Sequence, residues 1–241
     1  MGCVMGSDKF TWTAEDVDAI AGREHAAQTG STAGSDASPG LGRIPQIRRD
    51  GSERFHQEGN DLGFDLLGFW EWSASDVVSN ATRGRLAEYI VARAIGAADG
   101  VRDEWAAYDL LDPREISIEV KSASYIQSWH QDHLSAISFN CPKSIAWDPD
   151  TNRQSDASRR QAEVYVFALL AHQEQETLDP FNLSQWEFYV LPTVTLDRRE
   201  RSQHSIALKS LRALHGDPVG FAALSDAIAQ AAAVHRSATS G

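Results

Sequence analysis

Apolar residues recur every three or four positions in several parts of the chain. The first such segment begins near residue 80 and ends at one of two glycines, Gly96 or Gly100. The same spacing covers 221–235, after a shorter segment over 205–216 that also ends in glycine. Because one face of an α-helix presents every third or fourth residue, these segments predict three amphipathic helices.

Shorter apolar and β-branched runs predict four strands. Two of them, 105–111 and 116–122, flank Asp112-Pro113-Arg114-Glu115, a turn tetrad with proline at its second position, and so predict a hairpin. Two further runs, 164–172 and 186–193, are typical of strands buried on at least one face. With the helices, they predict an α/β fold: a mixed β-sheet of four to five strands with helices on both faces.

Residues 26–60 contain much Gly, Ser, Asp and Gln and few large apolar residues. A segment of this composition buries too little apolar surface to offset the conformational entropy that ordering removes. We therefore expect a flexible acidic tail and linker over 1–60, with a short helix at 12–21, followed by one folded domain over 61–235.

The segment 61–72 holds the densest aromatic cluster of the chain. Its large apolar side chains are those of Phe64, Leu66, Leu67, Phe69, Trp70 and Trp72. A role in the core or as a cap on the domain is favoured over a platform on which nucleic-acid bases stack.

Several classes of protein are excluded by composition. The longest apolar run, 164–171, has eight residues, far fewer than the roughly 20 that a membrane-spanning helix needs. The chain has no secretory signal pattern, and its start, MGCVMGS, has glycine where an acylation signal needs a hydroxyl residue. Two cysteines cannot form a disulfide framework, and no phosphate-binding glycine motif suggests a nucleotide cofactor. We expect a cytoplasmic protein without a membrane anchor.

The 241 residues include 22 basic and 34 acidic ones, giving a formal net charge of −12 and a pI of about 5.0. This balance argues against generic nucleic-acid binding, because proteins that grip the phosphate backbone usually present a basic surface. The acidity is uneven, however: residues 1–78 contain 6 basic and 13 acidic residues, whereas 79–160 contain 10 and 12. One bound divalent cation would neutralise this central segment.

Three acidic residues and a lysine are brought together by the predicted helix and hairpin. In ISIEVKS, Glu119 and Lys121 share one face, because successive side chains of a strand point to opposite faces. Folding the hairpin about its proline turn places Asp109 opposite Ile118 and diagonal to Glu119. Glu88 lies on the helix that precedes the hairpin. We therefore expect two carboxylates and a lysine to converge at one edge of the sheet.

This grouping suits metal-assisted hydrolysis of a phosphodiester. Asp109 and Glu119 offer the hard oxygen ligands that Mg²⁺ prefers, and Glu88 could complete the metal shell. Mg²⁺, or Mn²⁺ in its place, polarises the phosphodiester and lowers the pKa of a bound water, which Lys121 could orient. A Glu-x-Lys pair on a strand is more often only a weak surface ion pair, so spacing alone leaves both interpretations open.

The order of these residues resembles the PD-(D/E)XK, or restriction-endonuclease-like, superfamily. Its pattern is an acid, a variable gap and then acid-x-Lys on a hairpin, which Asp109 and Glu119-Val120-Lys121 match; the proline of the pattern is absent, since Asp109 follows Tyr108. Blocks similar to a widespread bacterial family of this kind run from about residue 63 to 228. They are NATRGRLAEYIVARAIG, IEVKSASYIQSW, RQAEVYVFALL and WEFYVLPT.

The resemblance implies a restriction-endonuclease-like core and metal-dependent cleavage of DNA, in restriction, defence or repair. It implies catalytic roles for Glu88, Asp109, Glu119 and Lys121, with the three acids around the metal. Gln127, just past the catalytic strand, could position the water or a phosphate, or else cap a following helix. DNA is the expected partner, and a homodimer is left open.

Arg159 and Arg160 are the best candidates among the basic residues for contacts with phosphate, although scattered surface charges need no such explanation. Two other functions stay open. One is an inactive module of the same fold that recruits a partner nuclease or helicase, against which the intact acid–acid–lysine set argues. The other is a nuclease that acts on RNA.

Overall fold

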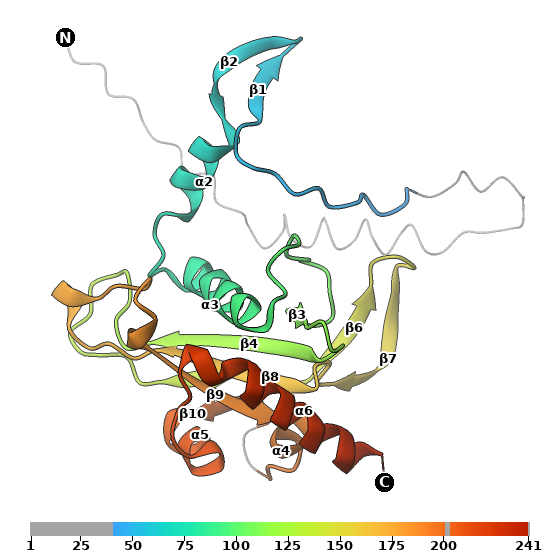
Figure 1. The fold of residues 1–241 in the computed structure, drawn as a ribbon, viewed down its shortest axis with the longest axis vertical. Helices are drawn as coiled ribbons and strands as arrows, with labels where there is room; N and C mark the ends of the chain where they lie inside the picture. Colours follow the sequence, from blue (N-terminus) through green and yellow to red (C-terminus); the bar gives the residue numbers. More distant parts are fainter. Residues whose placement is uncertain (1–40, 201–202, 241) are drawn as a thin grey trace, which may run out of the picture. The chain divides into compact units, whose positions relative to one another are not determined.

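The computed structural model describes residues 41–200 and 203–240. The helix predicted at 12–21 and the first part of the predicted linker lie outside the described residues. In the part that is described, a four-stranded β-sheet lies between helices, which confirms the predicted α/β class (Figure 1).

The central sheet has the strand order β3-β4-β8-β9. Its strands are β3 (Leu110–Leu111), β4 (Ser117–Ser124), β8 (Val164–Leu170) and β9 (Trp186–Pro192). The central pair, β4 and β8, is parallel, and both outer pairs are antiparallel, so the sheet is mixed as predicted. The first predicted strand, 105–111, is shortened to the two residues of β3.

Every residue of β8 is buried, because this strand is covered on both faces. Ile118 and Val120 of β4 join one hydrophobic core, whereas Phe167 of β8 joins a second core on the opposite face. The alternation of side chains along the strands therefore divides the interior into two layers.

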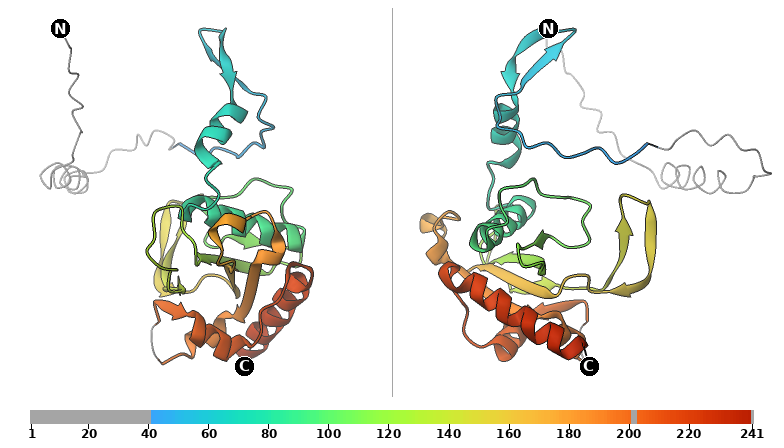
Figure 2. Two further views of the ribbon diagram at one scale, coloured as in Figure 1. Left: turned by 90° about the vertical axis from the view of Figure 1, so that its left-hand side faces the viewer. Right: turned by 45° about the vertical axis from the view of Figure 1, so that its right-hand side comes forward.

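Helices α3 (Asn80–Ile95) and α6 (Leu224–Thr239) cover the first face of the sheet (Figure 2). Gly96, one of the two predicted stops, ends α3 in a left-handed conformation with a φ of 74°, which costs glycine little. No helix among the described residues is long and apolar enough to cross a membrane.

The second face is covered by smaller elements. They are β5 (Ser138–Asn140), α4 (Thr193–Asp197), β10 (Ser205–Ala207) and α5 (Leu208–His215). The segment predicted as one helix over 205–216 thus begins as a strand, because Ser205–Ala207 pairs antiparallel with β5. Short 3₁₀ helices also lie in the connections: η1 (Gln175–Thr177), η2 (Leu183–Gln185) and η3 (Phe221–Ala223).

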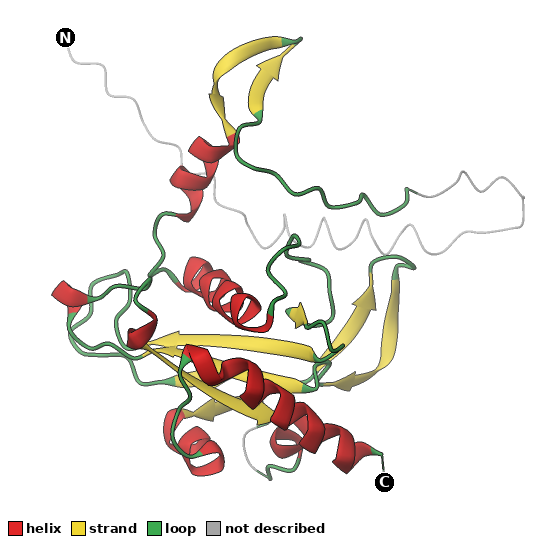
Figure 3. Ribbon diagram, viewed as in Figure 1, coloured by secondary structure: helices red, strands yellow, loops and turns green. Residues whose placement is uncertain are grey.

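A hairpin of β6 (Ser144–Asp148) and β7 (Arg153–Arg159) is not among the predicted elements (Figure 3). All seven residues of β7 are exposed. A strand with no buried face has no alternation of apolar and polar residues, and the sequence RQSDASR therefore gives no strand signal.

The predicted boundary between linker and domain at residue 60 falls inside a further hairpin. Strand β1 (Arg54–Gln57) pairs antiparallel with β2 (Asn60–Asp65) across Glu58 and Gly59. Both turn residues have positive φ, 52° and 84°, as a tight two-residue hairpin turn requires. The last part of the predicted linker is therefore a strand.

The aromatic cluster after this hairpin is exposed, which contradicts its predicted place in the core. Helix α2 (Leu66–Ala74) has no buried residue, and Trp72 is 85% exposed. The main chain of α2 is held locally, by hydrogen bonds from Leu66 to Glu53 and from Leu67 to Gly51. These backbone hydrogen bonds thus hold the helix in place, while its aromatic side chains are exposed to solvent.

We expect the substitution Trp72→Ala to leave the free energy of unfolding unchanged within about 0.5 kcal/mol, as is usual for an exposed side chain. Urea denaturation followed by circular dichroism measures this. A loss of more than about 2 kcal/mol, on the scale of a large core truncation, would show that the tryptophan is buried after all.

Candidate active site

The turn between β3 and β4 is built by Asp112. Its carboxylate accepts hydrogen bonds from the backbone N–H groups of Arg114 at 2.7 Å and Ile116 at 3.0 Å. Glu115 takes a left-handed conformation with a φ of 60°. The predicted turn is confirmed, and it fixes where the two strands meet.

Asp109 lies one position away from its predicted place. Leu110 pairs with Ile118, so Asp109 comes level with Glu119 rather than with Ile118. Regular pairing ends there, because the carboxylate of Asp109 accepts the N–H of Val120 at 2.7 Å. The side chain thus takes a backbone partner of β4 and is held at the edge of that strand.

Glu119 and Lys121 lie side by side on β4, as predicted. The Nζ atom of Lys121 is 2.5 Å from Oε1 of Glu119, and both side chains are partly buried. Tyr165 and Phe167 of β8 pair with these two residues in the parallel register. Both aromatic residues are buried, so the pair has an apolar neighbour on one side.

Glu88 reaches the same group from α3. Its side chain is only 12% exposed, and it forms an ion pair with Arg102. Burial raises the pKa of the Glu88 carboxyl above its ordinary value; the hydrogen bond from Arg102 opposes this, and the charge of Asp109 adds to it. Glu88 and Asp109 are therefore close enough to repel each other.

Asp109 is a partly buried acid of the group, and its pKa lies above the ordinary value. Burial raises the pKa of Asp109, and the charge of Glu119 raises it further, against the opposing effects of the Val120 N–H, Lys121 and Arg102. Burial lowers the pKa of Lys121, but Glu119 and the other two acids together raise it by more, so the ammonium stays charged. The positive charges of Lys121 and Arg102 do not fully balance the three acids of the group. A cation placed among these acids would therefore be stabilised electrostatically.

The donor set fits a divalent cation held by two carboxylates. Among residues 41–200 and 203–240, no group of three or more His, Cys, Asp or Glu side chains is arranged to hold a metal. Mg²⁺ does not need such a group, since it commonly takes one or two carboxylates and fills its shell with waters and substrate phosphate. Asp109 and Glu119, level with each other at the strand edge, supply this smaller set.

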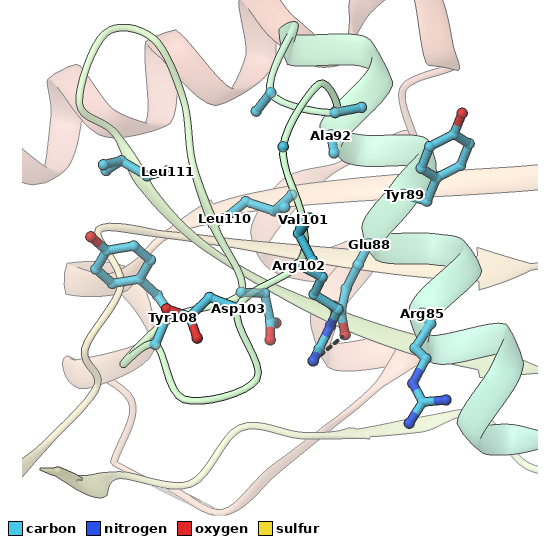
Figure 4. Close-up of a pocket in the computed structure, with 15 residues that line it drawn as sticks. Arg85, Glu88, Tyr89, Ala92, Val101, Arg102, Asp103, Tyr108, Leu110 and Leu111 are labelled. Atoms are coloured by element: carbon cyan, nitrogen blue, oxygen red, sulfur yellow. Dashed lines mark hydrogen bonds and ion pairs between the residues drawn. The ribbon is translucent and has the colours of Figure 1, made fainter. Parts of the chain in front are cut away.

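A cavity of about 410 Å³ opens beside these residues. Glu88 and Asp109 line it, together with Arg85 and Tyr89 of α3 and Tyr108. In Figure 4, the side chain of Arg85 extends to the same side of α3 as that of Glu88. Glu88 and Asp109 therefore face a cavity whose lining mixes charged and aromatic side chains with small and aliphatic ones.

Arg102 is the residue of this site that sequence reasoning missed. It lies in the loop 97–109 between α3 and β3, ahead of the run 105–111 that predicts a strand. Its guanidinium contacts Glu88, 14 positions earlier, and Glu104. Only the fold brings Arg102 to Glu88, so no local signal could have identified Arg102.

Gln127 lies in a different network. Its buried amide donates to the carbonyl of Ser124 at 2.8 Å and to the Ser135 hydroxyl at 3.2 Å, and accepts from Arg83 at 3.3 Å. No helix follows over 128–137, so the predicted helix cap is wrong. The side chain fixes the loop after β4, and we do not retain it as a catalytic residue.

Arg160 is not available to DNA. Its side chain is 0% exposed and pairs with Asp197 at 2.5 Å, while also donating to the carbonyls of Cys141 at 3.0 Å and Gln203 at 2.6 Å. The structure therefore contradicts a phosphate contact at Arg160. Arg159 is exposed on β7, and its contact with phosphate stays a prediction.

Comparison with protein families gives a match to the family described as bacteriophage T4 endonuclease IV, over residues 54–210. No curated protein and no solved structure matches the chain. The matched segment begins at β1, ends within α5 and includes Glu88, Asp109, Glu119 and Lys121. Because the match covers more than half of the residues of the chain, the chain belongs to the bacteriophage T4 endonuclease IV family, a family of nucleases.

Proposed function

We propose that this nuclease hydrolyses phosphodiester bonds of DNA with a divalent cation, at a site of the PD-(D/E)XK kind. The geometry that carries the proposal joins one helix and one hairpin. Asp109 lies level with Glu119, Glu119 pairs with Lys121, and Glu88 lines the same cavity as Asp109. Membership of a nuclease family supports the reaction class independently of this geometry.

Asp109 and Glu119 are the residues that would hold Mg²⁺ or Mn²⁺. When bound, such a cation polarises the phosphodiester and lowers the pKa of a coordinated water. The hydrogen bond from the Val120 N–H keeps the Asp109 carboxylate at the strand edge. Glu88, which lines the same cavity as Asp109, would support the same cation.

Lys121 acts on the water and the phosphate. Its ammonium is charged and is held by Glu119, so it can orient the attacking water or stabilise the negative charge that develops on the phosphoryl oxygens. The ion pair between these two residues restricts the rotamers of the lysine before substrate arrives. Preorganisation of this kind lowers the cost of reaching the transition state.

The proposal is tested by incubating the full chain with supercoiled plasmid, linear duplex, single-stranded DNA and RNA, each with Mg²⁺, Mn²⁺ or EDTA. We expect cleavage of at least one DNA substrate that requires the divalent cation. If only RNA is cleaved, the substrate is RNA and not DNA. Binding of DNA with no cleavage of any substrate would instead favour an inactive module that recruits a partner.

Glu119→Gln should lower the rate of cleavage at least about 100-fold, on the scale of losing one transition-state contact, because the variant removes a metal ligand and the partner of Lys121. The rate is measured on the best DNA substrate of that panel. Glu174→Gln, an exposed acid in the connection after β8, is the matched control and should cleave at the wild-type rate. Equal rates for wild type and Glu119→Gln would contradict the assigned site.

A further inference from the structure

Arg102 joins two carboxylates that differ strongly in exposure. Its guanidinium contacts Glu88, which is 12% exposed, and Glu104, which is 65% exposed. The segment that carries it, 97–109, connects α3 to β3 and supplies much of the lining of the cavity at the proposed site. Figure 4 shows the side chains of Arg102 and Glu88 pointing toward each other.

Both oxygens of the Glu88 carboxylate are engaged by this arginine. Nε of Arg102 donates to Oε2, and Nη2 is 3.4 Å from Oε1. A carboxylate held on both oxygens by a guanidinium forms one of the strongest ion pairs in proteins. Each oxygen of Glu88 in this state has a cationic partner, and a second cation would have to compete with the arginine.

Arg102 can leave Glu88 without losing all of its partners. Nη1 donates to Glu104, a solvent-exposed residue two positions further along the same loop. This second ion pair does not involve Glu88, so it does not depend on the contact between Arg102 and Glu88. Arg102 therefore keeps one acidic partner when its contact with Glu88 is broken.

We propose that Arg102 is a positioning residue for Glu88: it holds the Glu88 carboxylate while the site lacks a divalent cation, and must release it before Glu88 can serve that cation. This inference rests on the proposed metal-dependent function. It makes arginine and cation competitors for one carboxylate, so that removal of the arginine strengthens binding of the cation.

The competing explanation is that Arg102 only tethers the loop. A tether affects the stability of the protein, whereas a competitor changes its affinity for a divalent cation and does so only while Glu88 is present. The affinity for Mn²⁺, measured without DNA, therefore distinguishes a tether of the loop from a competitor for Glu88.

The experiment is a calorimetric titration of MnCl₂ into the full chain, with unfolding temperatures and DNA cleavage recorded on the same samples. The variants are Arg102→Gln, Arg102→Lys, Glu88→Gln and the double variant. Arg48→Gln is the matched control, because Arg48 donates to the carbonyl of Asp99 in the same loop and forms no ion pair with the carboxylates of the site.

We expect Arg102→Gln to bind Mn²⁺ at least about threefold more tightly than wild type, within the usual range of coupling between contacting side chains. Arg102→Lys, which keeps the charge, should bind like wild type, and so should Arg48→Gln. In the background of Glu88→Gln, loss of the arginine should have no effect on Mn²⁺ affinity.

Unchanged or weaker Mn²⁺ binding by Arg102→Gln, in a protein whose wild type binds Mn²⁺ and cleaves DNA, would overturn the role of Arg102 and leave the proposed function intact. An equal gain in Arg48→Gln would overturn it in the same way. If no variant binds Mn²⁺ and wild type cleaves DNA equally well in EDTA, the metal-dependent function itself is contradicted, and with it the role of Arg102.

Discussion

Replacing Lys121 by Met should lower the rate of DNA cleavage by about 10²–10⁴-fold, the range found when a residue that assists proton transfer or charge stabilisation is removed. The methionine fills similar space but cannot donate to the water or to the phosphate. Because the ammonium is charged and held 2.5 Å from Glu119, its loss removes an interaction that is prepared before substrate binds. Initial rates at saturating Mg²⁺ measure the effect.

The matched control is Lys209→Met, because Lys209 is an exposed lysine on α5 at a distance along the chain from the site. It should cleave at the wild-type rate. Lys121→Met should also keep its affinity for Mn²⁺ within a few-fold, since the lysine is not a ligand. Full activity in Lys121→Met would exclude the lysine from the reaction, and loss of Mn²⁺ binding would reassign it to the structure of the metal site.

Replacing Arg160 by Met should lower the free energy of unfolding by about 3 kcal/mol, since removal of one partner from a buried ion pair leaves polar groups without compensation. Asp197 and the carbonyls of Cys141 and Gln203 would lose their donor. Arg160 thus ties the residue after β7 to the end of α4 and to the segments that follow β5 and α4. Urea denaturation measures the change.

Arg159→Met is the natural comparison, because Arg159 is the neighbouring residue and is exposed on β7. It should unfold within about 0.5 kcal/mol of wild type. DNA affinity of Arg160→Met, measured at a temperature where the variant is folded, should stay unchanged. A variant that is as stable as wild type but binds DNA more weakly would restore Arg160 as a phosphate contact.

The parts of the fold that were predictable are those whose pattern comes from a buried face. Strand β4 alternates apolar and polar residues because one face packs under α3, and the helix itself shows the spacing that this packing requires. The proline turn set the register of the hairpin to within one residue. The remaining shift of one residue comes from the turn itself, where the Asp112 carboxylate accepts from the N–H groups of Arg114 and Ile116, a detail that the apolar pattern does not specify.

The parts that were not predictable lack such a pattern or contradict it. Hairpin β6–β7 has an entirely polar and exposed second strand, so no burial shaped its sequence. Aromatic residues normally indicate burial, yet Phe69 and Trp72 of α2 are exposed. The opposite error occurred at Arg160, where a charged residue that would ordinarily lie at the surface is buried with its partners.

For the site, sequence reasoning reached the residues that share one strand or one hairpin. Glu119 and Lys121 follow from the period of a strand, and Asp109 follows from the turn. Arg102 comes from an irregular loop and meets Glu88 only in the folded protein. Contacts of that kind need a structure, because neither spacing nor composition encodes them.

The proposed function requires that Asp109, with Glu119, serve a divalent cation. Its most direct test is the rate of DNA cleavage by wild type in Mg²⁺, by wild type in EDTA, and by Asp109→Asn in Mg²⁺. The asparagine side chain has nearly the size of the acid but carries no charge, so it keeps the shape of the site. We expect cleavage in the first sample and a rate at least about 100-fold lower in the other two; equal cleavage in all three would contradict the proposed metal site.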